Sequence, residues 1–245
     1  ASAAEVATAM SRGAFEFQGQ KCSAASRAYV PSNIWPEVKR IFMEQVNSFK
    51  MGTPEDTSNF VNAVIDERAF DKIAGFIDYC KAQSDAEIIT GGSYDKSKGY
   101  FIEPTTVVTS NPKFRTMCEE IFGPVLPIYT YDDFMQALAF VRQRPRPLAL
   151  YLFSHDRQLQ QQVLSDTHAG GVCLNETLLH VGQEDLPFGG IGPSGMGHYH
   201  GREGFLTFSH AKAVHQKGRL NSSFLAYPQH RGKLLDKLLK LLLRP

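Results

Sequence analysis

The chain has 245 residues, of which 42% are hydrophobic and 21% are charged, a composition that excludes an intrinsically disordered protein and a bundle of membrane-spanning helices. Its 26 basic and 25 acidic residues give a formal net charge of +1, which argues against a general nucleic-acid surface and favours a small-molecule ligand. The four cysteines form no Cys-x-x-Cys pair, so we expect neither a disulfide framework nor a metal site, and we expect a cytoplasmic protein.

The first residues, 1–10, are rich in alanine and predict a helix. They lead into the stretch Phe-Glu-Phe-Gln-Gly-Gln-Lys-Cys-Ser-Ala, in which Cys22 lies on a small polar turn. Gly19 lets the backbone bend sharply, and Lys21 precedes the thiol, so Cys22 is expected to be partly exposed and easier to ionise than a buried cysteine. The alternative interpretation of an arbitrary cysteine is a small core residue.

Helices and strands alternate through the middle of the chain. Apolar residues recur every three or four positions over 34–49, which predicts an amphipathic helix, and Asp66 is expected to cap a second helix. Further helices are predicted at 132–142 and 156–166, strands at 26–30, 87–90, 125–131, 148–154 and 171–174, and an extended stretch at 100–109. This order favours a three-layer α/β/α fold with a mostly parallel sheet, which binds ligands at the carboxyl ends of its strands.

A long irregular segment at 175–204 is rich in Gly, His and Pro and is expected to be a binding loop. Three of its glycines, Gly190, Gly192 and Gly195, match the dinucleotide-binding string. We reject that interpretation, because the string lacks the preceding strand and the following helix that the motif needs. These glycines are expected to let the loop fold tightly beside the reactive sulfur.

The histidines of the second half of the chain offer two alternatives. A metal site at His198, His200 and Glu203 is less favoured than solvated loop residues, because metal sites usually need a further ligand from elsewhere in the chain and a shaped second shell. A Cys–His hydrolase is the stronger alternative, since Cys22 could pair in space with a histidine. The candidates are His168, His180, His198 and His200.

The end of the chain is expected to be a tail, residues 221–245, that follows a domain of residues 1–220. Over 232–244, seven leucines are interspersed with Lys and Arg, which predicts a basic amphipathic helix. It is too short to span a bilayer. Docking on a partner subunit or on the parent domain is favoured over lying on a membrane surface.

Three stretches of the chain, in this order, resemble the aldehyde dehydrogenase family: the turn around Cys22, Glu-Glu-Ile-Phe-Gly-Pro at 119–124, and Leu-Pro-Phe-Gly-Gly at 186–190. The resemblance implies the family's catalytic domain. It also implies NAD(P)-dependent oxidation of an aldehyde to a carboxylic acid through a thiohemiacetal and a thioester on Cys22.

The same resemblance implies roles for five further residues. Glu120 falls where the family holds the ribose hydroxyls of the nicotinamide half of NAD or NADP, and Phe122 falls where a ring borders the nicotinamide. Ser23, Phe188 and Gly190 are implied substrate contacts; for Phe188 an ordinary core position is the equal alternative.

Two subfamilies share the resemblance. From residue 13 to about 122 the chain resembles pyrroline-5-carboxylate (glutamate semialdehyde) dehydrogenases, and from about 123 to 245 it resembles class 3 and coniferyl aldehyde dehydrogenases. Natural recombination and an engineered exchange both fit such a mosaic. We expect an apolar or aromatic aldehyde as substrate, with glutamate semialdehyde of proline catabolism as the alternative.

In the family, the general-base glutamate, the oxyanion-hole asparagine and the cofactor domain precede the cysteine. The chain begins with Ala1, so it is expected to be the catalytic half of a homo-oligomeric enzyme, inactive by itself. A non-catalytic oligomerisation module remains an alternative from a different class.

Overall fold

The computed structural model describes residues 1–221, 223, 227–230 and 232–243. It divides the chain into two compact units, residues 1–208 and residues 209–245. The first unit is built on a four-stranded sheet with the strand order β1-β6-β5-β2. These strands are β1 (Ala28–Pro31), β6 (Val125–Tyr131), β5 (Thr105–Thr109) and β2 (Ala86–Thr90). Both β1 and β5 pair with β6 in parallel, whereas β2 pairs antiparallel with β5, so the sheet is mixed and mostly parallel.

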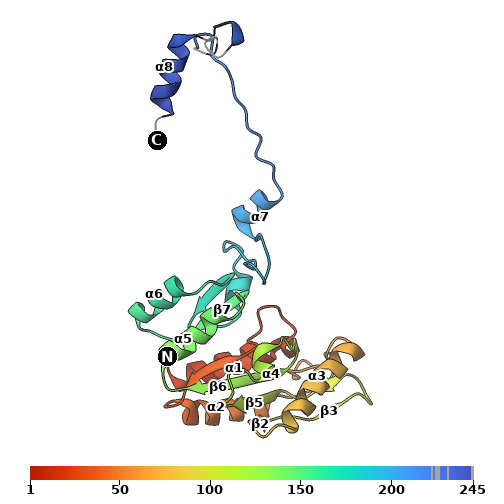
Figure 1. Cartoon of the computed structure of the whole chain (residues 1–245). Helices are drawn as coiled ribbons and strands as arrows, with labels where there is room; N and C mark the ends of the chain where they lie inside the picture. Colours follow the sequence, from red (N-terminus) through yellow and green to blue (C-terminus); the bar gives the residue numbers. More distant parts are fainter. Residues whose placement is uncertain (222, 224–226, 231, 244–245) are drawn as a thin grey trace. The chain divides into compact units, whose positions relative to one another are not determined.

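Helices cover both faces of this sheet (Figure 1). Successive residues of a strand point to opposite faces, and in β6 the side chain of Val125 joins one core whereas Leu126 joins the other. The core on the Val125 side includes α3 (Glu67–Lys81), and the core on the Leu126 side includes α1 (Ala3–Phe15) and α2 (Trp35–Ser48). The predicted three-layer α/β/α fold is therefore confirmed.

Polar side chains set the beginnings of the main helices. Ser2 and Glu5 form a reciprocal capping box at α1, and the Asp66 carboxylate accepts a hydrogen bond of 2.7 Å from the Ala69 N–H at the start of α3, as predicted. Asp133 and Asp156 cap α5 (Phe134–Gln143) and α6 (Arg157–Asp166) in the same way. Residues of this type compensate the unpaired N–H groups of a first helical turn.

The first helix is longer than predicted, ending at Phe15 rather than at residue 10. The reason is tertiary packing. Phe15 is fully buried, and its ring lies 6.2 Å from that of Phe42 in α2. An apolar anchor of this size outweighs the weak propensity of the residues before it.

Several short elements were not predicted. The extended stretch at 100–109 is two strands, β4 (Phe101–Ile102) and β5, separated by Glu103 and Pro104, since proline cannot donate to a strand ladder. Shortly before it in the chain, β3 (Tyr94–Asp95) pairs antiparallel with β4. A short helix, α4 (Arg115–Cys118), precedes the Glu119–Pro124 segment.

The segment after α5 carries its own small sheet. The strands β7 (Ala149–Leu152) and β8 (Gly171–Leu174) pair in parallel, apart from the four-stranded sheet. The long loop that follows contains the short 3-10 helix η2 (Leu179–Gly182), and α7 (Gly201–Thr207) begins inside the stretch expected to be irregular. The unit that starts at Ser209 contains η4 (Pro228–His230) and the predicted amphipathic helix, α8 (Lys233–Leu242).

Candidate functional site

The turn that carries Cys22 is held by an unusual backbone. Directly after α1, the 3-10 segment η1 (Glu16–Gly19) contains Phe17, Gln18 and Gly19 with φ angles of 56°, 57° and 65°. A Cβ atom on Gly19 would lie 2.5 Å from the Gly123 carbonyl oxygen, so only glycine fits there. This close approach brings the Cys22 turn against the Glu119–Pro124 segment, which lies far from it in sequence.

These two segments line a shallow pocket with about 390 Å³ of space, part of it open to solvent. It contains three of the predicted site residues, Cys22, Glu120 and Phe122. The other lining residues are Ala14, Gly19, Lys21, Ala24, Ala25, Ser26, Ile121, Gly123 and Val125. The Cys22 residue is exposed rather than packed in the core, so the thiol is available to a molecule that enters the pocket.

Phe122 and Glu120 are presented beside this thiol. Phe122 has a φ of 59° and is 44% exposed, a strained and poorly buried state for an aromatic residue. The segment is fixed from below, because the Lys72 ammonium donates a hydrogen bond of 2.9 Å to the backbone oxygen of Glu120. An exposed carboxylate and an exposed ring next to a thiol fit the two groups of a nicotinamide riboside, a sugar diol and a flat heterocycle.

A charged network lies at the base of the turn. Lys21 donates a hydrogen bond of 2.5 Å to the Glu16 carboxylate, which also pairs with Arg12 at 2.7 Å. Burial alone would raise the pKa of Glu16, but the bonds from Lys21 and Arg12 outweigh it and the pKa is lowered. Lys21 directly precedes Cys22 in the chain, and its ammonium group already pairs with the Glu16 carboxylate.

The backbone N–H of Cys22 forms no hydrogen bond within the part of the chain that the structure describes. It is therefore available to donate to an oxygen atom bound in the pocket. Such a free amide is the usual component of an oxyanion hole, which stabilises negative charge on an oxygen in a transition state.

The four cysteines differ in their surroundings. Cys80 is buried, which raises its pKa to about 11, and burial also raises the pKa of Cys173. Cys118 is exposed, like Cys22, but it does not line the pocket with Glu120 and Phe122. Cys22 is thus the cysteine that combines exposure with a place in the pocket.

Ser23 lies behind the turn. It is 4% exposed and does not line the pocket, and its backbone oxygen accepts a hydrogen bond of 2.5 Å from the Tyr151 hydroxyl. Burial raises the pKa of Tyr151 to about 12. The Tyr151 ring packs edge-on against His180 at 5.8 Å, and His180 lies 5.6 Å from Phe188. Tyr151 is a site residue that the sequence did not predict; its only signal is a hydroxyl within the apolar strand 148–154.

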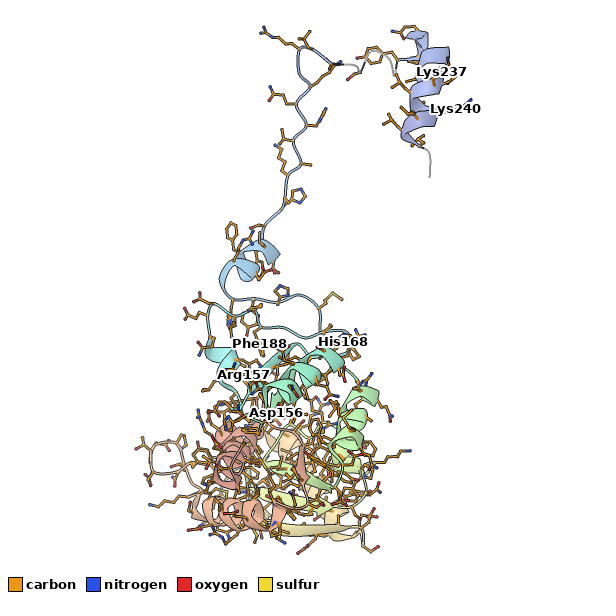
Figure 2. All side chains as sticks on the ribbon, turned by 90° about the vertical axis from the view of Figure 1, so that its left-hand side faces the viewer. Asp156, Arg157, His168, Phe188, Lys237 and Lys240 are labelled. Atoms are coloured by element: carbon orange, nitrogen blue, oxygen red, sulfur yellow. The ribbon has the colours of Figure 1, made fainter. Side chains whose placement is uncertain are left out.

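The late loop is held closed by its own residues. Phe188, labelled in Figure 2, is 5% exposed. Its backbone exchanges two hydrogen bonds of 3.0 Å with that of Tyr199. A Cβ atom on Gly190 would lie 2.0 Å from the Ser194 oxygen, so the chain folds back tightly there. The structure does not bring Phe188 or Gly190 into the Cys22 pocket, and their contact with substrate stays a prediction.

The histidines find other partners. His180 Nδ1 lies 3.2 Å from Cys173 Sγ, and His198 Nε2 lies 3.0 Å from a Glu203 oxygen. His168 lines a separate pocket with three arginines. None of the candidate histidines lines the Cys22 pocket, so the geometry gives no support to a Cys22–His pair. Among the described residues, no group of three His, Cys, Asp or Glu side chains could hold a metal ion.

Comparisons with known proteins place this pocket in context. The model of the "Aldehyde dehydrogenase family" matches residues 1–214. The chain is 44% identical over 220 residues to a probable coniferyl aldehyde dehydrogenase of Pseudomonas aeruginosa, covering 90% of this chain and 45% of that protein. It is 45% identical over 192 residues to the mitochondrial Delta-1-pyrroline-5-carboxylate dehydrogenase of Dictyostelium discoideum, covering 75% of this chain and 34% of that protein.

A solved structure of an aldehyde dehydrogenase also resembles this chain. The NAD+ complex of an aldehyde dehydrogenase from Bacillus cereus matches with a TM-score of 0.80 and 25% identity, over 86% of this chain and 42% of that one. The chain therefore spans less than half the length of each of these three proteins.

Proposed function

Because the chain belongs to the aldehyde dehydrogenase family, we propose that it is the nucleophile-bearing half of an NAD(P)-dependent aldehyde dehydrogenase, with Cys22 as the nucleophile. One observation carries the proposal: Cys22 is exposed in a pocket that it shares with Glu120 and Phe122. Exposure makes the thiol reachable, and the pocket supplies the neighbours that a thiolate, an aldehyde and a nicotinamide ring require.

The chain's own residues account for the first step. The Cys22 sulfur forms a bond to the aldehyde carbon, the carbonyl π electrons move to the oxygen, and that oxygen takes up a proton to give a thiohemiacetal. The Cys22 N–H donates to this oxygen as charge develops on it. NAD(P), when bound, would supply the hydride acceptor. Loss of the hydride from the thiohemiacetal carbon and of the hydroxyl proton to solvent would leave a thioester on Cys22. Water then cleaves the thioester and releases the carboxylic acid.

Glu120 and Phe122 serve binding rather than bond-making in this scheme. The Glu120 carboxylate would accept hydrogen bonds from the ribose hydroxyls, and the Phe122 ring would border the nicotinamide. Their support is the exposed, strained position of Phe122 and the tether from Lys72 to the backbone of Glu120. The general base, the second oxyanion donor and the rest of the cofactor site belong, by the family resemblance, to residues that precede the cysteine. On this proposal, the chain alone does not complete the oxidation.

For the substrate, we propose an apolar or aromatic aldehyde. The described pocket contains one basic side chain, Lys21, and Glu16 already pairs with it. A substrate carboxylate, as in glutamate semialdehyde, needs an unpaired cation or several free donors. The relatives include both a probable coniferyl aldehyde dehydrogenase and a Delta-1-pyrroline-5-carboxylate dehydrogenase, so glutamate semialdehyde is the second candidate.

A protection experiment tests both points. The chain is alkylated with iodoacetamide in the presence of an aromatic aldehyde or of glutamate semialdehyde, and the four cysteines are quantified by mass spectrometry. The aromatic aldehyde is expected to slow alkylation of Cys22 but not of Cys118, which is the exposed internal control. Stronger protection by glutamate semialdehyde would reverse the substrate assignment. Equal effects at both cysteines would remove the support for an aldehyde site at Cys22.

The alternative from another class, a non-catalytic oligomerisation module, predicts a different outcome. Such a module forms tight oligomers, and its exposed cysteines react without selectivity. Homo-oligomer formation by the whole enzyme is also part of our proposal, so a size measurement separates the two only when it is read together with the protection experiment.

A further inference from the structure

The unit formed by residues 209–245 has a charge unlike that of the rest of the chain. Of the chain's 26 Lys and Arg and 25 Asp and Glu, this unit holds eight and one, which leaves 18 and 24 for residues 1–208. Its formal charge is therefore +7, against −6 for the first unit. An asymmetry of this size points to an acidic partner for the basic segment.

The helix α8 divides its surface between leucine and charge. At about 100° per residue, the leucines of 235–243 occupy an arc of roughly 200°, and Asp236, Lys237 and Lys240 occupy the remainder. Three of these leucines, Leu241, Leu242 and Leu243, are 72%, 74% and 75% exposed. Lys237 and Lys240 (Figure 2) form no ion pair within the described part of the chain.

The width of the apolar arc argues against a second helix, in a coiled coil, as the partner of α8. In a coiled coil, two of every seven positions are apolar, which makes a narrow stripe. A helix that packs on a globular core has about three apolar positions in every seven. Here the apolar residues cover more than half of the circumference, every one is leucine, and none is an aromatic or arginine anchor of the kind that dominates protein interfaces. A wide, featureless apolar face bordered by cations matches a helix lying at a water–lipid boundary.

The length of the helix sets its orientation. Its 10 residues extend for about 15 Å, half the hydrocarbon thickness of a bilayer. No helix within the described residues is long and apolar enough to cross a membrane. At a membrane, a helix of this length can therefore bury its leucines only by lying in the plane of the interface.

We propose that α8 binds the surface of an anionic lipid bilayer, with the leucine face in the acyl region and Lys237 and Lys240 among the headgroups. Lys237 and Lys240, which border the leucine face of α8, supply the attraction to the surface, and burial of the exposed leucines supplies the insertion. This proposal uses none of the residues that line the Cys22 pocket, and it stands whether or not the proposed dehydrogenase function holds.

The test uses the full chain and sedimentation with two kinds of vesicles, phosphatidylcholine alone and phosphatidylcholine mixed with phosphatidylglycerol. Binding is expected to the mixed vesicles, and it is expected to weaken as salt is raised. Lys237→Glu changes the charge at the surface by two units, so the partition coefficient falls roughly thirtyfold. Leu239→Gln keeps the charge and removes apolar area, and it weakens binding at least about tenfold.

Each variant has a matched control in the same unit but outside α8. Lys212→Glu makes the same charge change, and Leu220→Gln makes the same neutral change at a leucine that is 99% exposed; both are expected to bind within about threefold of the parent chain. The proposal is overturned if the controls weaken binding as much as the α8 variants, or if both kinds of vesicle bind equally. It is also overturned if no vesicle binds and the chain instead self-associates through a contact that Leu239→Gln removes, since α8 would then pack on a second copy.

Discussion

Replacing Tyr151 by Phe tests how the nucleophile turn is held. The Tyr151 hydroxyl donates to the Ser23 backbone oxygen at 2.5 Å and also interacts with the backbone of Leu178, at the entrance to the late loop. It thereby joins the Cys22 turn to that loop through one atom. Removing it leaves partly buried backbone groups without this partner.

The expected cost follows from these two contacts. A net hydrogen bond is worth about 1 kcal/mol, and an unsatisfied buried group costs about 1–3 kcal/mol, so Tyr151→Phe should lower the free energy of unfolding by about 1–3 kcal/mol. Urea denaturation measures this change. Because the chain has two units, unfolding of the first unit needs a probe of its own. The fluorescence of Trp35, the single tryptophan, serves this purpose because Trp35 lies in α2.

Tyr29 supplies the matched control. Its hydroxyl is buried and has no hydrogen-bond partner among the described residues, so Tyr29→Phe removes the same atom without breaking a bond. It should leave the free energy of unfolding unchanged or raise it slightly. A loss at Tyr29→Phe equal to that at Tyr151→Phe would refute the reasoning, and so would a neutral Tyr151→Phe.

Three further results are expected. Asp66→Ala removes the cap of α3 and should lower the free energy of unfolding by about 1 kcal/mol in urea denaturation, whereas Asp66→Asn should cost less than half of that; equal losses would contradict a capping role. Gly19→Ala places a Cβ 2.5 Å from the Gly123 oxygen at a φ of 65°, so it should cost at least about 1–2 kcal/mol and change the alkylation rate of Cys22, and a silent variant would contradict the proposed turn geometry. Burial lowers the pKa of His180, so the imidazole is protonated more readily in the unfolded chain than in the folded one. Stability is therefore fully present above the unfolded pKa of about 6.5 and falls as pH drops below it, until the folded pKa is reached; His180→Gln should flatten this slope between about pH 7.5 and 5.5, and an unchanged slope would contradict the assignment.

Local sequence signals predicted most of the fold. The strands 125–131 and 171–174 have the predicted bounds, and the Asp66 cap was identified from residue type and spacing. The extension of α1 was not predictable in this way, because it depends on the burial of Phe15 against α2, a contact between distant residues. The short strands around Pro104 fell below the length at which periodicity gives a signal.

In the site, too, the features that depend on neighbouring residues were predictable, whereas contacts between distant segments were not. The sequence placed a thiol on a glycine-bearing turn, and the family resemblance linked it to Glu120 and Phe122. It did not indicate that Gly19 would pack against the Gly123 backbone, or that the Tyr151 hydroxyl would donate to the Ser23 backbone oxygen. Both contacts form only when segments far apart in the chain pack together. Left-handed backbone at Phe17 and Phe122 was also invisible, because neither residue type favours it.

The proposed role of Cys22 has one most direct test. The chain is treated with a limiting amount of a vinyl ketone, a thiol-directed analogue of an aldehyde, and the adducts on all four cysteines are mapped by mass spectrometry over time. Buried Cys80 and Cys173 are expected to react last, since burial raises the pKa of both thiols. Our account predicts that Cys22 is labelled first and that Cys118, which is also exposed but lies outside the pocket, follows more slowly. Labelling of Cys118 or Cys173 ahead of Cys22 would contradict it.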